Sequence, residues 1–284
     1  MPSCMPASPT GWSWLPASAC RSTRRSSATT WSRRIAIAAR VRDERSAGLA
    51  RRAAALLDDA GQRALQRSDD SAAVNLLSRS IALLAPTEPR RRELLIDLGD
   101  ALWETGRLAE ADEALAEAIA SGGGAADLVS GRAELHRVAV RSFNDPSVNI
   151  TEQLAVADRW EPIFTAVGDH RGLATVAMAR GDVHLLQCHW QDRARASTRA
   201  VEHASAVGDE RTVRTATQMQ MNAIRFGPTP ATLGIEQIRV LREAAFGDRP
   251  SHHPEAQLLA MLGRFDEARD AIDAARAWLR SSGS

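Results

Sequence analysis

The chain has 284 residues but no lysine and no tyrosine, so its 36 basic residues are all arginine. Without lysine it cannot contain the Gly-x-x-x-x-Gly-Lys-Ser/Thr loop that cradles nucleotide phosphates, which excludes a P-loop ATPase module from this sequence. The same bias is typical of a GC-rich genome, because alanine and arginine codons are GC-rich whereas lysine and tyrosine codons are not. It indicates little about mechanism.

Cysteine, long apolar runs and net charge are also scarce. The three cysteines form no paired framework, which favours a reducing, cytoplasmic setting. No apolar run approaches the roughly 18 residues that a membrane-spanning helix needs. A formal charge of +1 lacks the basic footprint of a dedicated nucleic-acid binder. We therefore expect a cytoplasmic chain that contacts neither membranes nor nucleic acids directly.

Acidic residues are absent from residues 1–42, which contain seven arginines and eight serines. This composition resembles a transit peptide, but four prolines in the first 16 residues oppose the amphipathic helix that such a peptide needs. Two other interpretations stay open. One is a disordered tail, and the other is translation out of frame, because GC-rich back-translation of 28–40, shifted by one base, reads as an amphipathic helix. On each interpretation, this segment does not pack well with the rest.

From residue 43 to 284 the sequence consists of alanine-rich helical patterns separated by a recurring Gly-Asp phrase. Val167-Gly168-Asp169, Val207-Gly208-Asp209 and Phe246-Gly247-Asp248 each close one helical run and open the next, at intervals of about 40 residues. A fixed period in this range indicates stacked helical repeats, in which each helix pair buries its apolar face only against its neighbours.

Apolar residues at helical spacing predict about six helix pairs and no strands. The expected helices cover 49–64, 73–84, 94–102, 108–119, 125–143, 153–167, 173–187, 190–206, 212–226, 235–245, 254–262 and 265–279. The fold class predicted for residues 43–284 is therefore all-α, an α-solenoid of tetratricopeptide type.

Two hairpins match the tetratricopeptide pattern closely. Gly99 in the first helix of one hairpin leaves room for the second helix, where small Ala111 faces it twelve residues later, and Gly61 and Ala73 repeat that spacing. In a later hairpin, Arg193 replaces the expected alanine. We expect that hairpin to splay slightly or to turn the arginine stem outward.

Several segments carry a more specific resemblance, above all the Gly-Pro-Thr-Pro break at 227–230 and the Gly-Arg-Phe-Asp-Glu-Ala-Arg hairpin at 263–269. With 71–77 and 164–174, they make residues 44–282 resemble the tetratricopeptide region of bacterial regulators that carry a class III adenylate/guanylate cyclase head and a P-loop ATPase. Related arrays occur in LuxR-type regulators. The resemblance implies a scaffold that relays a partner's signal to the domains of a parent protein.

The sequence departs from these regulators in having no recognisable cyclase segment, and it stops where such arrays usually continue. We therefore expect a fragment of a longer regulator or the product of a broken gene. His184, Cys188 and His189 lie at i, i+4 and i+5, but a structural zinc site needs about four ligands. We expect a buried cysteine with a wedged histidine here, and we predict no catalytic residue, cofactor or metal.

The candidate partner-binding residues are polar side chains on the first helix of each pair, which lines the concave surface of such arrays. In the repeat register they are Asp100, Glu104, Asp182, Asn222 and Arg225. A groove of mixed charge suits a peptide or a protein domain. The predicted function is therefore a non-catalytic protein–protein interaction and regulatory module. One alternative is part of a cyclase or ATPase whose catalytic domains lie outside this chain, and another is part of a transcriptional regulator.

Overall fold

The computed structural model describes residues 46–123, 127–144, 150–247 and 254–282. The chain divides into two units, Met1–Arg52 and Ala53–Ser284. In the first unit the described residues, 46–52, are helical, and helix also covers 53–66 of the second unit. The interpretations of residues 1–42 lie outside the described residues.

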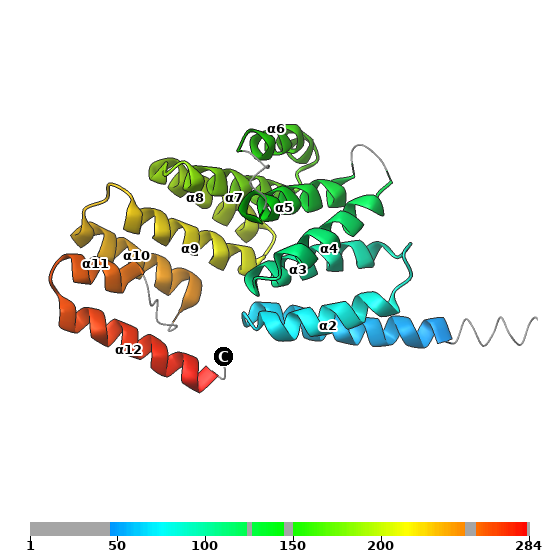
Figure 1. The fold of residues 1–284 in the computed structure, drawn as a ribbon, viewed down its shortest axis with the longest axis horizontal. Helices are drawn as coiled ribbons and strands as arrows, with labels where there is room; N and C mark the ends of the chain where they lie inside the picture. Colours follow the sequence, from blue (N-terminus) through cyan, green and yellow to red (C-terminus); the bar gives the residue numbers. More distant parts are fainter. Residues whose placement is uncertain (1–45, 124–126, 145–149, 248–253, 283–284) are drawn as a thin grey trace, which may run out of the picture. The chain divides into compact units, whose positions relative to one another are not determined.

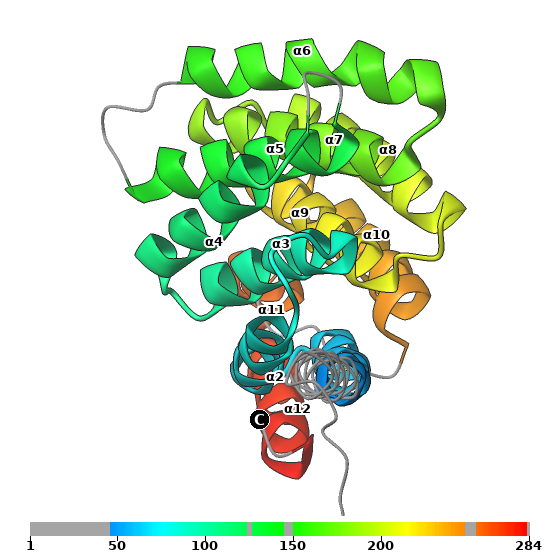
Figure 2. The same cartoon turned by 90° about the vertical axis from the view of Figure 1, so that its right-hand side faces the viewer.

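The second unit continues as a series of consecutive helices (Figures 1 and 2). They are α2 (Asp70–Leu83), α3 (Pro89–Glu104), α4 (Leu108–Ala120), α5 (Leu128–Asn144), α6 (Ile150–Val167), α7 (His170–Leu186), α8 (Trp190–Ala206), α9 (Glu210–Phe226), α10 (Ala231–Phe246), α11 (Pro254–Met261) and α12 (Phe265–Ser282). Each packs against the next along the chain. The described part of the chain contains no strand, and the prediction of an all-α solenoid is confirmed. None of its helices combines the length and apolar character needed to cross a bilayer.

The Gly-Asp phrase works as a helix stop followed by a helix start. Gly168 and Gly208 have φ angles of +68° and +67°, a left-handed conformation that glycine adopts at no steric cost when a helix ends. Asp169 and Asp209 then cap the next helix, each accepting a hydrogen bond of 3.1 Å from a backbone N–H of its first turn. In the third copy, Gly247 also has a positive φ angle, +57°, at the end of α10, whereas Asp248 lies outside the described residues.

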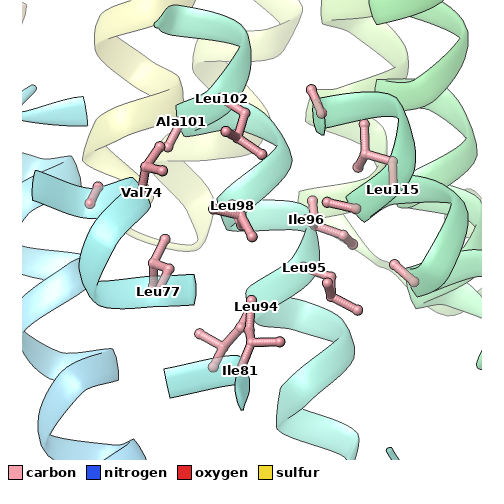
Figure 3. Close-up of a cluster of buried hydrophobic side chains, with 14 of the residues drawn as sticks. Val74, Leu77, Ile81, Leu94, Leu95, Ile96, Leu98, Ala101, Leu102 and Leu115 are labelled. Atoms are coloured by element: carbon pink, nitrogen blue, oxygen red, sulfur yellow. The ribbon is translucent and has the colours of Figure 1, made fainter. Parts of the chain in front are cut away.

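The first helices of the array pack closely on their partners through glycine. A Cβ atom on Gly99 would lie only 2.8 Å from Cγ of Leu115, and Gly61 approaches Leu77 in the same way. The predicted close contact at Gly99 is confirmed. The nearest atoms, however, belong to Leu115, one helical turn beyond Ala111. Leu77 and Leu115 lie within the buried cluster of α2, α3 and α4 (Figure 3).

Helix α6 also packs closely against glycines, in this case through aromatic rings. Trp160 packs against Gly131 of α5, and Phe164 packs against Gly172 of α7. Both rings are buried, and they stack on each other with their centroids 5.5 Å apart. A side chain larger than hydrogen at either glycine would displace a ring, so these two contacts fix α6 on its neighbours.

Candidate functional site: a charged groove between alternate helices

A cavity of about 580 Å³ opens in the second unit, and we call it the inner groove. Its lining comes from residues 62–66, from one face of α3, α5 and α7, and from the start of α9 with the turn before it. These are the first helices of successive pairs. On α3 the lining includes Glu93, Asp97, Asp100 and Glu104, spaced three or four residues apart because one face of a helix recurs every 3.6 residues.

The structure brings three of the five candidate residues together in the inner groove. Asp100, Glu104 and Asp182 line it, whereas Asn222 and Arg225 do not. The groove receives the N-terminal half of α9, while the other half packs against α10 and α11 in the cluster around Met221. The guanidinium of Arg225 lies 3.8 Å from the ring centroid of Phe226. The repeat register therefore assigned Asn222 and Arg225 to the correct helix, α9, but both residues lie outside the cavity.

Asp100 is the centre of an ion-pair network that joins three helices. Its Oδ1 accepts a hydrogen bond of 2.7 Å from Nδ1 of His136 on α5, and its Oδ2 accepts one of 3.1 Å from Nη1 of Arg211 on α9. Burial raises the pKa of Asp100, but the charges and hydrogen bonds of His136 and Arg211 outweigh it and lower the pKa overall. Burial lowers the pKa of His136, yet Asp100 raises it overall.

More carboxylates surround Arg211 than this one cation can neutralise. Burial raises the pKa of Asp97, and Gln62 opposes this by donating a hydrogen bond of 2.6 Å to its Oδ2. Burial also raises the pKa of Asp70 and of Glu104; the charge of Asp100 adds to this effect at both groups, and Arg211 opposes it. The α3 side of the inner groove is therefore strongly acidic.

Asp182 pairs with the arginine that the hairpin pattern did not expect. Arg193 does not turn outward: its side chain is 6% exposed, and its Nη1 donates a hydrogen bond of 2.8 Å to the backbone oxygen of Gly181. The same nitrogen lies 3.7 Å from Oδ1 of Asp182. Of the two alternatives expected for this hairpin, the outward stem was wrong, because a carbonyl and a carboxylate lie within reach inside; the slight splaying stays a prediction. Burial raises the pKa of Asp182 to about 6, against the opposing charges of Arg193 and His136.

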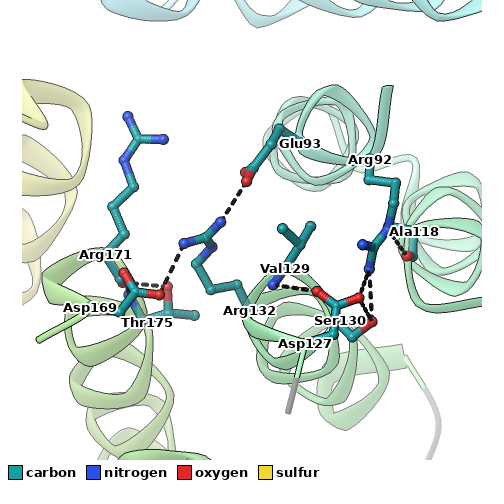
Figure 4. A network of polar contacts seen from close by, with 11 residues as sticks. Arg92, Glu93, Ala118, Asp127, Val129, Ser130, Arg132, Asp169, Arg171 and Thr175 are labelled. Carbon is teal, nitrogen blue, oxygen red and sulfur yellow. Dashed lines mark hydrogen bonds and ion pairs between the residues drawn. The ribbon is translucent and has the colours of Figure 1, made fainter. Parts of the chain in front are cut away.

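On α5 and α7 the lining of the inner groove includes two arginines, Arg132 and Arg171. Arg132 of α5 bridges two carboxylates, donating at 2.6 Å to Glu93 of α3 and at 3.0 Å to the capping Asp169 (Figure 4). The guanidinium of Arg171 projects away from this network, and within the described residues it has no ion-pair or hydrogen-bond partner (Figure 4). Arg171 is exposed and lines the groove. Among the described residues it therefore has no counterion, and an acidic group from outside can pair with it.

Sequence reasoning missed most of the groove's charged residues, among them His136, Arg171 and Arg211. These three lie on first helices, so the repeat register could have included them. His136 follows Arg132 by one helical turn, and Arg171 and Arg211 each come two positions after a Gly-Asp phrase. That shared position after the turn is the signal that points to the groove.

The prediction of a buried Cys188 beside a wedged His184 was wrong. Cys188 is exposed and has a φ angle of +56° in the turn after α7, where other hairpins of the array have glycine. Because the helix ends at Leu186, Cys188 no longer shares a helical face with His184. The turn instead brings His184 near His189 and Asp192.

Comparison with models of known protein families finds no match, and no curated protein matches the sequence.

Proposed function

We propose that the inner groove binds an extended polypeptide segment of a protein partner, and that the array is a non-catalytic interaction module of tetratricopeptide type. The observation that carries this proposal is the charged lining that successive first helices contribute to one cavity. Small-molecule sites are mostly apolar with a few polar groups. A groove lined by many carboxylates and guanidinium groups suits a polymer that offers a charge at several points along its length.

The distribution of charge defines the partner segment. The carboxylates of Asp97, Asp100 and Glu104 favour a basic side chain opposite α3, because Arg211 and His136 together do not balance all three. Unpaired Arg171 on α7 favours an acidic side chain or a terminal carboxylate. We therefore propose a segment that carries a cation and an anion several residues apart, so that its charge pattern sets both its direction and its register.

The resemblance to the repeat regions of bacterial signalling regulators supports a regulatory role in the cytoplasm. In that role the array reports the presence of a partner to the catalytic or DNA-binding parts of a parent protein. The array itself supplies a binding surface and no chemistry. Purified protein that hydrolyses ATP above a buffer blank would contradict this part of the proposal.

The test is selection of peptides from a random display library on the purified chain, followed by measurement of Kd by fluorescence anisotropy with the selected synthetic peptides. The variant Glu104→Gln/Arg171→Gln removes one charge of each sign from the inner groove. Because exposed contacts contribute about 1 kcal/mol each, we expect binding to weaken by roughly 10- to 30-fold. Added salt should weaken wild-type binding as well.

The matched control is Arg107→Gln/Glu110→Gln, which removes an exposed ion pair at the start of α4, outside the groove lining. It changes the charge of the protein in the same way and should leave the Kd unchanged. Equal binding by the groove variant and wild type would refute the proposed site. Failure to select any saturable peptide would refute the peptide-binding function.

A further inference from the structure

Three side chains that can bind a metal ion converge at the turn between α7 and α8. His184 lies in the last turn of α7, His189 immediately precedes α8, and Asp192 lies in its first turn. One ligand atom from each lies within 4.8 Å of the other two. Independently, Nδ1 of His184 is buried and has no hydrogen-bond partner among the described residues. We propose that His184, His189 and Asp192 form a binding site for a zinc ion.

Backbone hydrogen bonds fix the turn that brings these residues together. The N–H of His189 donates to the carbonyl oxygen of His184 at 2.8 Å, and the N–H of Arg193 donates to that of His189 at 2.9 Å. Cys188 between them has the left-handed conformation that reverses the chain. The two histidines and the first turn of α8 are therefore held together before any ion arrives, which reduces the ordering that binding requires.

The charges around the site permit a cation. Arg180 pairs with Asp158 and Glu161, Arg193 with Asp182, and Arg195 with Asp192, so each nearby guanidinium has its own carboxylate. A carboxylate has two oxygens and can hold Arg195 and a metal ion together.

The donor set selects the metal. Two imidazole nitrogens and one carboxylate oxygen suit zinc, which binds such ligands at about 2.0–2.2 Å and accepts water in a fourth position. His189 is exposed, so its ring can rotate to meet an ion beside half-buried His184. Because the ligands come from both sides of one turn, bound zinc would tie α7 to α8 and stabilise this hairpin.

The test uses the full chain without a histidine tag, stripped of metal with EDTA and titrated with zinc by calorimetry. We expect a saturable site that is weakened at least about tenfold by His189→Ala and by Asp192→Asn, since even residues outside the ligand shell contribute 10- to 100-fold. Zinc should also raise the Tm of wild type but not that of His189→Ala. Because His189 is exposed, its replacement disturbs packing little. His184→Gln is the third variant, and circular dichroism checks that it is still folded.

Two variants serve as matched controls. Cys188→Gly keeps the left-handed turn and removes the neighbouring thiol. His203→Gln removes one member of another histidine pair, in which Nδ1 of His170 lies 3.1 Å from Nδ1 of His203. Both should bind zinc as wild type does. The proposal is wrong if zinc does not bind saturably, if the His189 and Asp192 variants bind it normally, or if His203→Gln abolishes binding.

Discussion

Replacing Gly99 by alanine tests how tightly the first repeats are packed. The new Cβ would lie 2.8, 3.0 and 3.2 Å from Cγ, Cδ2 and Cδ1 of Leu115. Leu115 is fully buried, so it has no route to solvent by which to make room. Alanine should therefore force either the two helices or the leucine to shift, even though it is the better helix former.

Two opposing terms set the size of the effect. Alanine gains about 0.8–1.0 kcal/mol over glycine within a helix, and overpacking a buried site costs about 1–3 kcal/mol. The net expectation is a loss of up to about 2 kcal/mol in the free energy of unfolding. For a unit of this size, each 1 kcal/mol shifts the Tm by about 2–4 °C. Gly99→Leu, which adds more atoms at the same place, should lose more.

Thermal melts of four variants separate the two terms. Gly48→Ala is the control, because a Cβ there meets no other described residue within 4 Å, and it should raise the Tm slightly. Leu115→Ala should cost about 2–5 kcal/mol by itself but remove the obstacle. In that background, Gly99→Ala should become neutral or stabilising, giving a coupling energy of about 1–3 kcal/mol. A Tm that rises with Gly99→Ala in the wild-type background would refute the close contact.

Three further predictions concern the α7–α8 hairpin. Arg193→Ala should cost about 1–3 kcal/mol in urea unfolding, because it removes the hydrogen bond to the carbonyl oxygen of Gly181 and the cation beside the half-buried Asp182 carboxylate, and a loss below about 1 kcal/mol would contradict these contacts. The pKa of Asp182 is about 6 when folded, above its usual 3.8, so the folded state holds this proton more tightly and wild type should lose stability as pH rises from about 4 to 6. Compared with Asp182→Asn, wild type should lose at most about 3 kcal/mol of stability over this pH range. If the urea midpoints of both proteins depend on pH in the same way, the raised pKa of Asp182 is excluded. Cys188→Gly should raise the Tm, because relieving a left-handed residue with a side chain gains about 1 kcal/mol; an unchanged or lower Tm would argue against strain at this turn.

The helices and their turns could be predicted from the sequence because the forces that form them are local. Gly168 and Asp169 act within one turn of their own position, through a left-handed backbone and a capping carboxylate. The apolar spacing that predicted every helix is also local, because it depends on residues three or four positions apart. Even Gly99, whose contact is with another helix, lies in a hairpin whose partner is the next element along the chain.

The parts that sequence reasoning missed depend on distances that no local pattern encodes. Arg193 turns inward because Gly181 and Asp182 happen to offer it oxygens at that depth. The contact of Arg211 with Asp100 joins residues 111 positions apart, and a repeat register says nothing about which repeats meet across a cavity. For the same reason the register could assign Asn222 to the correct helix without locating the end of the groove.

Arg211 and Arg214 also have a mechanical consequence. In an array whose repeats touch only their neighbours, the ends can move apart by small bends shared among many joints, as in a spring. Here Arg211 reaches Asp100 of α3, and Nη2 of Arg214 donates a hydrogen bond of 2.8 Å to the backbone oxygen of Gln66. These two contacts of α9 therefore link repeats that are not neighbours in the array. A pulling force would act first on these two contacts. Once they break, the array would extend by small bends between repeats while every helix stays folded.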